Sequence, residues 1–221
     1  MNVIFDMDGV LFDTERVYAE IYEEVALEWG LGDVREAVLG CIGRNANDSR
    51  QFFISCVGED FPYDEYVREV ISRYKIREEK EGLPMKTGVK ELLSYLKQEN
   101  CRIGLASSTR REKVLSYIER AGIADYFQIV IGGDMVEHSK PNPDIYLIAC
   151  RELGTKTTET YAIEDSPNGI RAAYHAGMKA IMVPDMITPE EEIKKMTCHI
   201  CRDLLEVKDY LAGERRQLWQ H

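Results

Sequence analysis

Short apolar runs alternate with amphipathic segments over most of the chain. The first run, residues 2–6, predicts a buried strand, and comparable runs predict strands over residues 102–106, 128–131, 161–163, 179–183 and 197–201. Between them, apolar residues recur at helical spacing over residues 89–99, 110–121, 143–153, 167–176, 190–195 and 203–212. Strands that alternate with helices in this way indicate an α/β fold, with a Rossmann-like parallel sheet covered by helices on both faces.

One long segment interrupts this series after the first strand. From about residue 15 to residue 82 no strand-like alternation occurs, whereas Val17, Ile21 and Val25 fall on one helical face. We therefore expect an inserted helical domain over residues 15–82, and an α/β core domain formed by residues 1–14 and 83–221. The polar tail, residues 214–221, is expected to fray.

The composition narrows the classes of partner. The 221 residues include 28 basic and 39 acidic side chains, a formal net charge of −11, whereas a nucleic-acid surface needs concentrated Lys and Arg. No stretch approaches the ~18 apolar residues that cross a bilayer, and the first apolar run meets Asp6 too soon for a signal peptide. We expect a cytoplasmic protein that contacts neither nucleic acid nor membrane, with a monomer as the default state.

Six cysteines are present, and in a reducing compartment they are expected to be free thiols. Cys198 and Cys201 have the spacing of metal ligands. A structural zinc site needs about four ligands, however, and no second pair is near. An ordinary strand or loop is the better interpretation of this segment.

Polar side chains follow the predicted strands directly. Ligands of an open parallel sheet bind beyond the carboxyl ends of its strands, so these positions are the candidates for chemistry. They are Asp6 and Asp8 after the first strand, Ser107, Ser108 and Thr109 after the second, Lys140 in the loop after the third, and Glu164 and Asp165 after the fourth.

Each of these residues alone has an ordinary structural interpretation. An acid or a Ser-Ser-Thr run after a strand often caps a helix, and a lone lysine in a proline-rich loop is usually solvated. Together, however, the four acids at one edge would repel one another unless a cation lay among them. Such carboxylates suit Mg²⁺, and Lys140 with the Ser107 hydroxyl would supply a phosphoryl group with positive charge and hydrogen-bond donors.

Four segments carry a resemblance to a known family. They are FDMDGVLFDT at residues 5–14, LASS at 105–108, SKPNPD at 139–144 and IEDSPNG at 163–169. In this order they resemble the four motifs of the haloacid dehalogenase superfamily, in the subgroup of phosphatases and phosphomutases that carries a helical cap after the first strand. The resemblance implies that residues 15–82 form this cap, which closes over the core.

The resemblance also implies a role for each acid. Asp6 would be the nucleophile that forms an aspartyl-phosphate, and Asp8 would be the general acid and base. Mg²⁺ would be held by Asp6, the main-chain carbonyl of Asp8 and Asp165. Glu164 would lie close to the metal or bridge to it through water.

Substrate contacts are implied in the same way. Ser107 and Lys140 would hold the phosphoryl oxygens. Further candidates for substrate contact are Ser108, Thr109 and, in the cap loop GCIGR at residues 40–44, Arg44.

Within the subgroup, the choice lies between a phosphatase and a mutase. β-Phosphoglucomutase-like mutases have a histidine five residues after the acid equivalent to Asp13, where this chain has Tyr18; Asp13 itself is expected to brace the loop. We therefore expect a Mg²⁺-dependent phosphatase of a small phosphorylated metabolite, a sugar or polyol phosphate, with a phosphosugar mutase as the alternative. A dehalogenase would have no use for Asp8, and a non-catalytic phosphate-binding protein would be expected to lack one of the motif residues, all of which are present.

Overall fold

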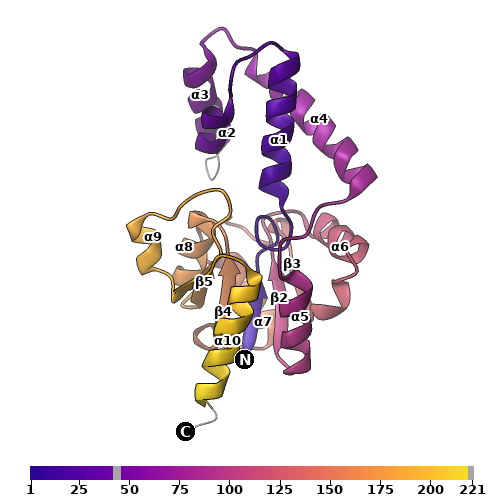
Figure 1. Cartoon of the computed structure of the whole chain (residues 1–221). Helices are drawn as coiled ribbons and strands as arrows, with labels where there is room; N and C mark the ends of the chain where they lie inside the picture. The colour runs from indigo at the N-terminus through magenta and orange to yellow at the C-terminus, as the bar shows by residue number, and fades with distance from the viewer. Residues whose placement is uncertain (42–45, 219–221) are drawn as a thin grey trace. The chain divides into compact units, whose positions relative to one another are not determined.

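The structure of the chain, a computed structural model, describes residues 1–41 and 46–218 (Figure 1). The chain divides into two compact units, Met1–Asp13 with Pro84–His221 and Thr14–Leu83. We call the first the core unit and the second the cap unit, and each is described by itself.

A six-stranded parallel sheet forms the centre of the core unit (Figure 1). All neighbouring strands are parallel. The predicted α/β fold with a parallel sheet is therefore confirmed. The strands are β1 (Asn2–Phe5), β2 (Arg102–Ala106), β3 (Ile129–Ile131), β4 (Thr160–Glu164), β5 (Lys179–Met182) and β6 (His199–Ile200), in the spatial order β3-β2-β1-β4-β5-β6.

Helices cover both faces of this sheet. Val3, Ile4 and Phe5 of β1 are all fully buried, as expected for a strand with a packed layer on either side. The helices α7 and α8 pack on the face that carries Ile4, and α5 and α10 lie next to each other on the opposite face (Figure 1). The helices of the core unit are α5 (Val89–Gln98), α6 (Arg111–Arg120), α7 (Asp144–Leu153), α8 (Pro167–His175), α9 (Glu191–Lys195) and α10 (Leu204–Leu218).

The last helix differs from the prediction, because α10 continues well beyond residue 212 and ends at Leu218. Two contacts explain this extension. The Tyr161 hydroxyl donates a hydrogen bond to Glu214 at 3.1 Å, and Arg215 pairs with Glu99 at 2.8 Å. The expectation of a frayed tail is therefore wrong for residues 214–218.

The cap unit is helical throughout its described residues. Val17, Ile21 and Val25 of its first helix are buried, which is the face that the sequence periodicity predicts. Ion pairs such as Arg73 with Glu28 lie at the surface of the unit. Within the described part of the chain, no helix combines the length and apolar character needed to span a membrane. The cap helices are α1 (Thr14–Glu28), α2 (Arg35–Cys41), α3 (Ala46–Val57) and α4 (Tyr63–Glu81).

Candidate active site

The register of the sheet brings the ends of three central strands to one level. Phe5 of β1 is paired with Leu105 of β2 on one side and with Ile163 of β4 on the other. The main-chain N–H of Asp6 continues this pairing by donating to the Ile163 carbonyl at 2.9 Å. The residues that follow β1 and β2, and those that end and follow β4, are therefore neighbours at the carboxyl edge.

Lys140 joins two buried acids at this edge. Its ammonium group lies 2.5 Å from Asp6 Oδ1 and 2.6 Å from Glu164 Oε1, and it also donates to the Ala106 carbonyl at 3.4 Å. Burial lowers the pKa of Lys140, but the carboxylates of Asp6 and Glu164 outweigh it and raise the pKa above its usual value. Lys140 is therefore a permanent cation here, and it offsets part of the buried negative charge.

Tyr146 belongs to this cluster although we did not expect it from the sequence. Its hydroxyl donates to Glu164 Oε1 at 2.6 Å, and its ring lies 5.1 Å from the Lys140 ammonium. Burial, and then the negative charge of Glu164, raise the pKa of Tyr146 well above its ordinary value, so the hydroxyl stays a donor. The available signal was its position just after SKPNPD, two residues beyond Asp144 in an otherwise apolar helical stretch.

Glu164 is committed to contacts within the chain. Oε1 accepts from Lys140 and Tyr146, and Oε2 accepts from the Ser166 hydroxyl at 3.3 Å. Gly169 in the first turn of α8 packs directly against this carboxylate, since a Cβ atom there would lie 1.9 Å from its Cδ. Glu164 thus orients Lys140 from a fixed position.

Three acids lie close enough together to hold a metal ion. Ligand atoms of Asp6, Glu164 and Asp165 all lie within 4.8 Å of one another. Burial raises the pKa of Asp6 to about 8, with Lys140 lowering it and the charges of Glu164 and Asp8 raising it further. Because burial and the neighbouring acids raise the pKa of Asp6 despite Lys140, this group of carboxylates fits a further cation.

The loop after β1 is shaped to approach Asp165. Gly9 has a φ of 75°, and a Cβ atom on it would lie 2.2 Å from Asp165 Oδ2. The main-chain N–H of Gly9 donates to the Phe12 carbonyl at 2.9 Å, which closes the turn. Only glycine combines this backbone conformation with so close an approach.

Asp8 lies against the residues that follow β2 rather than among the three acids. Its Oδ2 accepts hydrogen bonds from Thr109 Oγ1 at 2.9 Å and from Ser107 Oγ at 3.3 Å. Ser107 is fully buried, and its hydroxyl oxygen also accepts the main-chain N–H of Thr109 at 3.0 Å. The structure therefore brings Asp8 and Ser107 together, as the sequence predicts for a phosphoryl-binding edge.

The other predicted residues lie apart from this network or outside the described chain. Ser108 follows Ser107 but is exposed, and Arg44 lies outside the described residues. Asp13 lies 3.4 Å from Lys86, whose ammonium group also contacts Asp185 at 2.5 Å. This pairing agrees with a bracing role for Asp13.

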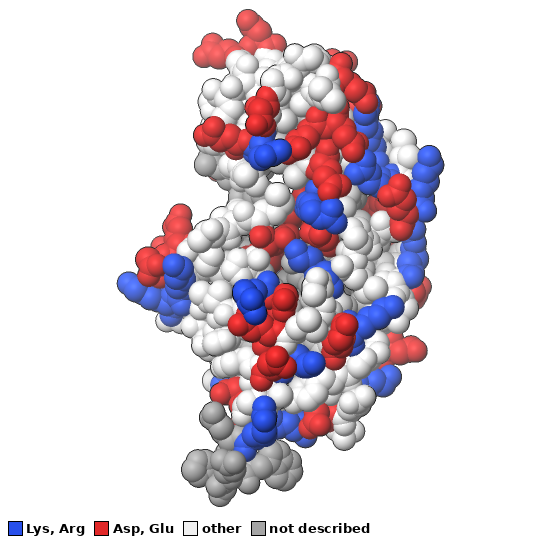
Figure 2. Space-filling model, viewed as in Figure 1, with Lys and Arg blue, Asp and Glu red and all other residues white. Residues whose placement is uncertain are grey.

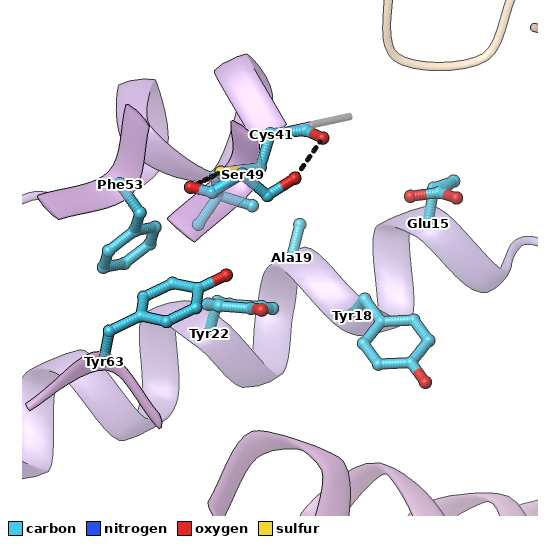
Figure 3. Close-up of a pocket in the computed structure, with 9 residues that line it drawn as sticks. Glu15, Tyr18, Ala19, Tyr22, Cys41, Ser49, Phe53 and Tyr63 are labelled. Atoms are coloured by element: carbon cyan, nitrogen blue, oxygen red, sulfur yellow. Dashed lines mark hydrogen bonds between the residues drawn. The ribbon is translucent and has the colours of Figure 1, made fainter. Parts of the chain in front are cut away.

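The cap unit contains a cavity of about 330 Å³ between its helices. Figure 3 shows the rings of Tyr22, Phe53 and Tyr63 gathered at one end of it, with Glu15 and Tyr18 towards the other. The lining that the structure describes includes one acidic and no basic side chain. Burial, followed by the neighbouring Tyr63, raises the pKa of Tyr22, so its hydroxyl is neutral. The cavity therefore suits an uncharged group.

The surface charge does not favour a nucleic acid. Figure 2 shows acidic and basic side chains interspersed over the face that it draws, on a chain with a net charge of −11. Such a surface lacks the concentration of Lys and Arg that phosphate backbones require.

Comparisons with known proteins show which family the chain resembles. A family model described as haloacid dehalogenase-like hydrolase matches residues 3–183. The chain is 31% identical to the phosphorylated carbohydrates phosphatase of Thermotoga maritima, over 81% of this chain and 82% of that protein. It is also 31% identical to the fructose-1-phosphate phosphatase YqaB of Escherichia coli, over 82% and 95% of the two chains. The crystal structure of CbbY from Rhodobacter sphaeroides with phosphate is similar, with a TM-score of 0.69 at 26% identity, over 93% and 95% of the chains.

Proposed function

Because the chain belongs to the haloacid dehalogenase-like hydrolase family, we propose that it is a Mg²⁺-dependent phosphatase that hydrolyses a small phosphorylated metabolite through an aspartyl-phosphate on Asp6. The predicted membership of this superfamily is confirmed, and so is the class of enzyme, a phosphoric monoester hydrolase. The metal, the intermediate and the substrate are the parts that we propose.

The observation that carries the proposal is the pairing of Asp6 with Lys140 beside a second, separately held acid. Asp6 Oδ1 lies 2.5 Å from the Lys140 ammonium, while Asp8 is bound by the Ser107 and Thr109 hydroxyls. One acid is thus buried and paired with a lysine, and the other accepts hydrogen bonds from neutral hydroxyls. This division suits one group that attacks phosphorus and another that transfers protons.

The two steps then use these residues in turn. In the first, an Asp6 carboxylate oxygen bonds to phosphorus, the ester P–O bond breaks, and Asp8 gives its proton to the leaving oxygen. In the second, Asp8 takes a proton from a water molecule, whose oxygen bonds to phosphorus as the Asp6–phosphorus bond breaks. The second step thus returns Asp6 and Asp8 to their starting states. Ser107 and Lys140 hold the phosphoryl oxygens in both steps.

The metal site would use Asp6 and Asp165, with the main-chain carbonyl of Asp8. Both carboxylates belong to the group within 4.8 Å, whereas Glu164 is already engaged by Lys140 and Tyr146 and is better placed to orient or to bridge through water. When bound, Mg²⁺ neutralises negative charge on the phosphoryl group and on the attacking carboxylate. Oxygen ligands of this kind are those that Mg²⁺ prefers.

A sugar or polyol phosphate is the substrate class that we propose. Two relatives that support it are named for phosphorylated carbohydrates and for fructose 1-phosphate. The cap cavity, with tyrosine hydroxyls and no basic side chain in its described lining, is suited to an uncharged hydroxyl-bearing group. A cytoplasmic location and a monomeric state are further predictions from the sequence.

The alternative is a β-phosphoglucomutase-like mutase, and one contact argues against it. Tyr18 stands where the mutases have a histidine, and its ring stacks on Tyr74 with centroids 3.9 Å apart. A stacked tyrosine cannot take over the protonation chemistry of an imidazole at neutral pH. Conversion of β-glucose 1-phosphate to glucose 6-phosphate, primed with the bisphosphate, would overturn this choice.

The test is phosphate release from a panel of sugar, polyol and aryl phosphate esters, with Mg²⁺ and with a chelator. We expect release that requires Mg²⁺, with turnover reduced by about 10⁴-fold or more in Asp6→Asn. Equal rates for wild type and Asp6→Asn would show that Asp6 is not the nucleophile. An absence of release from every ester would overturn the phosphatase assignment.

A further inference from the structure

Thr109 makes a shorter hydroxyl contact with Asp8 than Ser107 does. Its Oγ1 donates to Asp8 Oδ2 at 2.9 Å, compared with 3.3 Å for Ser107 Oγ. We propose that Thr109 is a positioning residue that fixes the Asp8 carboxyl group for proton transfer to the leaving oxygen. The inference rests on the proposed function, in which Asp8 is the general acid.

The main chain holds Thr109 in place from both sides. Its N–H donates to Ser107 Oγ at 3.0 Å, and its carbonyl accepts the N–H of Gly133 at 2.9 Å. Gly133 lies tightly against this loop, since a Cβ atom on it would be 2.1 Å from the Ser108 carbonyl oxygen. The Thr109 hydroxyl is therefore presented to Asp8 from a fixed backbone, and a positioning group requires such support.

Ser107 cannot perform this task once substrate is bound. A serine hydroxyl has a single proton to donate, and the proposed function gives that proton to a phosphoryl oxygen. The Asp8 contact of Ser107 is then lost, while that of Thr109 is retained. In the substrate complex, Thr109 is consequently the hydroxyl that keeps the acid oriented, even though it touches neither phosphorus nor the metal.

A positioning role predicts a dependence on the leaving group. An alkyl ester leaves as a basic alkoxide and needs the proton of Asp8, whereas p-nitrophenolate leaves readily as an anion. In Thr109→Val, which keeps the shape and removes the hydroxyl, we expect kcat/KM for an alkyl phosphate, which reports the step that releases the alcohol, to fall by about 10²-fold. The kcat/KM for p-nitrophenyl phosphate should change by less than about threefold, and Thr109→Ser should restore most of the loss on the alkyl ester.

The experiment compares wild type, Thr109→Val and Thr109→Ser on an alkyl phosphate that the wild type turns over and on p-nitrophenyl phosphate. The ratio of the two kcat/KM values is measured on one preparation, so it does not depend on the fraction of folded enzyme. Inhibition by inorganic phosphate is measured in parallel and should be unchanged, because a positioning residue does not bind phosphate. In an Asp8→Asn background, Thr109→Val should have no further effect on the alkyl ester, since the two residues act as one unit.

The outcomes separate this inference from the function on which it rests. Equal loss on both esters, or a weaker inhibition by phosphate in Thr109→Val, overturns the positioning role and leaves the phosphatase assignment intact. An additive loss in the Asp8→Asn background also overturns it. A wild-type protein that releases phosphate from neither ester overturns the proposed function, and the inference with it.

Discussion

The core unit and the cap unit bury different kinds of side chain. In the core unit, Asp6, Lys140 and Glu164 are buried in mutual contact at the sheet edge. In the cap unit, the interior contains aromatic pairs such as Phe53 with Tyr66, at 5.5 Å between ring centroids, and ion pairs such as Arg77 with Glu24 are surface features. Buried charges are costly unless they are paired, so their presence in one unit needs a reason.

Phosphoryl transfer supplies that reason, because it needs fixed charges in a site with little water. The two units should therefore respond to substitution in different ways. Changes at the core edge should lower turnover and stability together, while changes in the cap cavity should alter which substrate is preferred. Four substitutions or conditions test this contrast, in order of the effect that we expect.

Lys140→Met should have the largest effect. It leaves Asp6 and Glu164 buried without their shared cation, so we expect turnover to fall by about 10³-fold and the free energy of unfolding by about 3–5 kcal/mol. Lys86→Met is the matched control, since Lys86 also bridges two acids, Asp13 and Asp185, within the core unit. Denaturant unfolding and phosphate release should show stability lost in both variants and turnover lost only in the first. A comparable loss of turnover in Lys86→Met would contradict the assignment of the catalytic charge to Lys140.

Gly9→Ala should have the next largest effect. The added Cβ would meet Asp165 Oδ2 at 2.2 Å in a backbone conformation with positive φ, so we expect the affinity for Mg²⁺ to fall by about 10²-fold. Gly213→Ala in α10 is the control, because nothing lies within 4 Å of its Cβ position and alanine is the better helix former. Titration calorimetry with Mg²⁺ measures both. Unchanged affinity in Gly9→Ala would remove Asp165 from the proposed metal ligands.

We expect a smaller effect of Asp6 on the pH dependence of stability. The pKa of Asp6 is raised from 3.8 to about 8 in the folded chain, chiefly by burial, so the native state holds a proton that the unfolded state has lost between these values. The contribution of Asp6 to stability is thus present at low pH and is lost as the pH rises towards 8. In chelator, unfolding from pH 5 to pH 8 should show this downward slope in wild type and a shallower one in Asp6→Asn. Identical slopes would show that Asp6 is not the buried group responsible.

Substitutions in the cap cavity should have the smallest effects. Tyr22→Phe and Tyr63→Phe remove hydroxyls from the cavity and keep its rings, so we expect KM for a sugar phosphate to rise by about fivefold with kcat nearly unchanged. The KM for p-nitrophenyl phosphate, which lacks sugar hydroxyls, serves as the internal control. Equal changes for both esters, or a fall in kcat, would contradict the proposal that the cap cavity affects substrate preference rather than turnover.

The fold could be predicted well wherever the chain is locally consistent. The bounds of β2 are those that the apolar run predicts, because an apolar strand set between helical patterns has few alternatives. The predicted strand over residues 161–163 extends in the structure to Glu164, which is fully buried as the last residue of β4. From the sequence, this acid is predicted to lie in the loop after the strand, because a charged residue normally ends an apolar run.

The grouping of Lys140 with the acids at one sheet edge could be predicted from the sequence, but the individual contacts between side chains could not. The pairing of Asp8 with Thr109 joins residues 101 positions apart, and its geometry depends on how two loops meet. Tyr146 was missed because a tyrosine in an apolar helical stretch usually indicates packing. Its hydrogen bond to Glu164 requires the tertiary placement of α7 against β4, which periodicity alone does not give.

The central claim is that Asp6 forms a covalent bond to phosphorus. It is tested most directly by acid quenching after brief incubation with radiolabelled p-nitrophenyl phosphate, whose leaving group needs no proton from Asp8, and Mg²⁺, followed by peptide mapping. Asp8→Asn, which slows the water step, should accumulate label on the peptide that contains Asp6, and Asp6→Asn should show none. Label on another residue, or turnover of the ester by Asp6→Asn at the wild-type rate, would contradict the proposed mechanism.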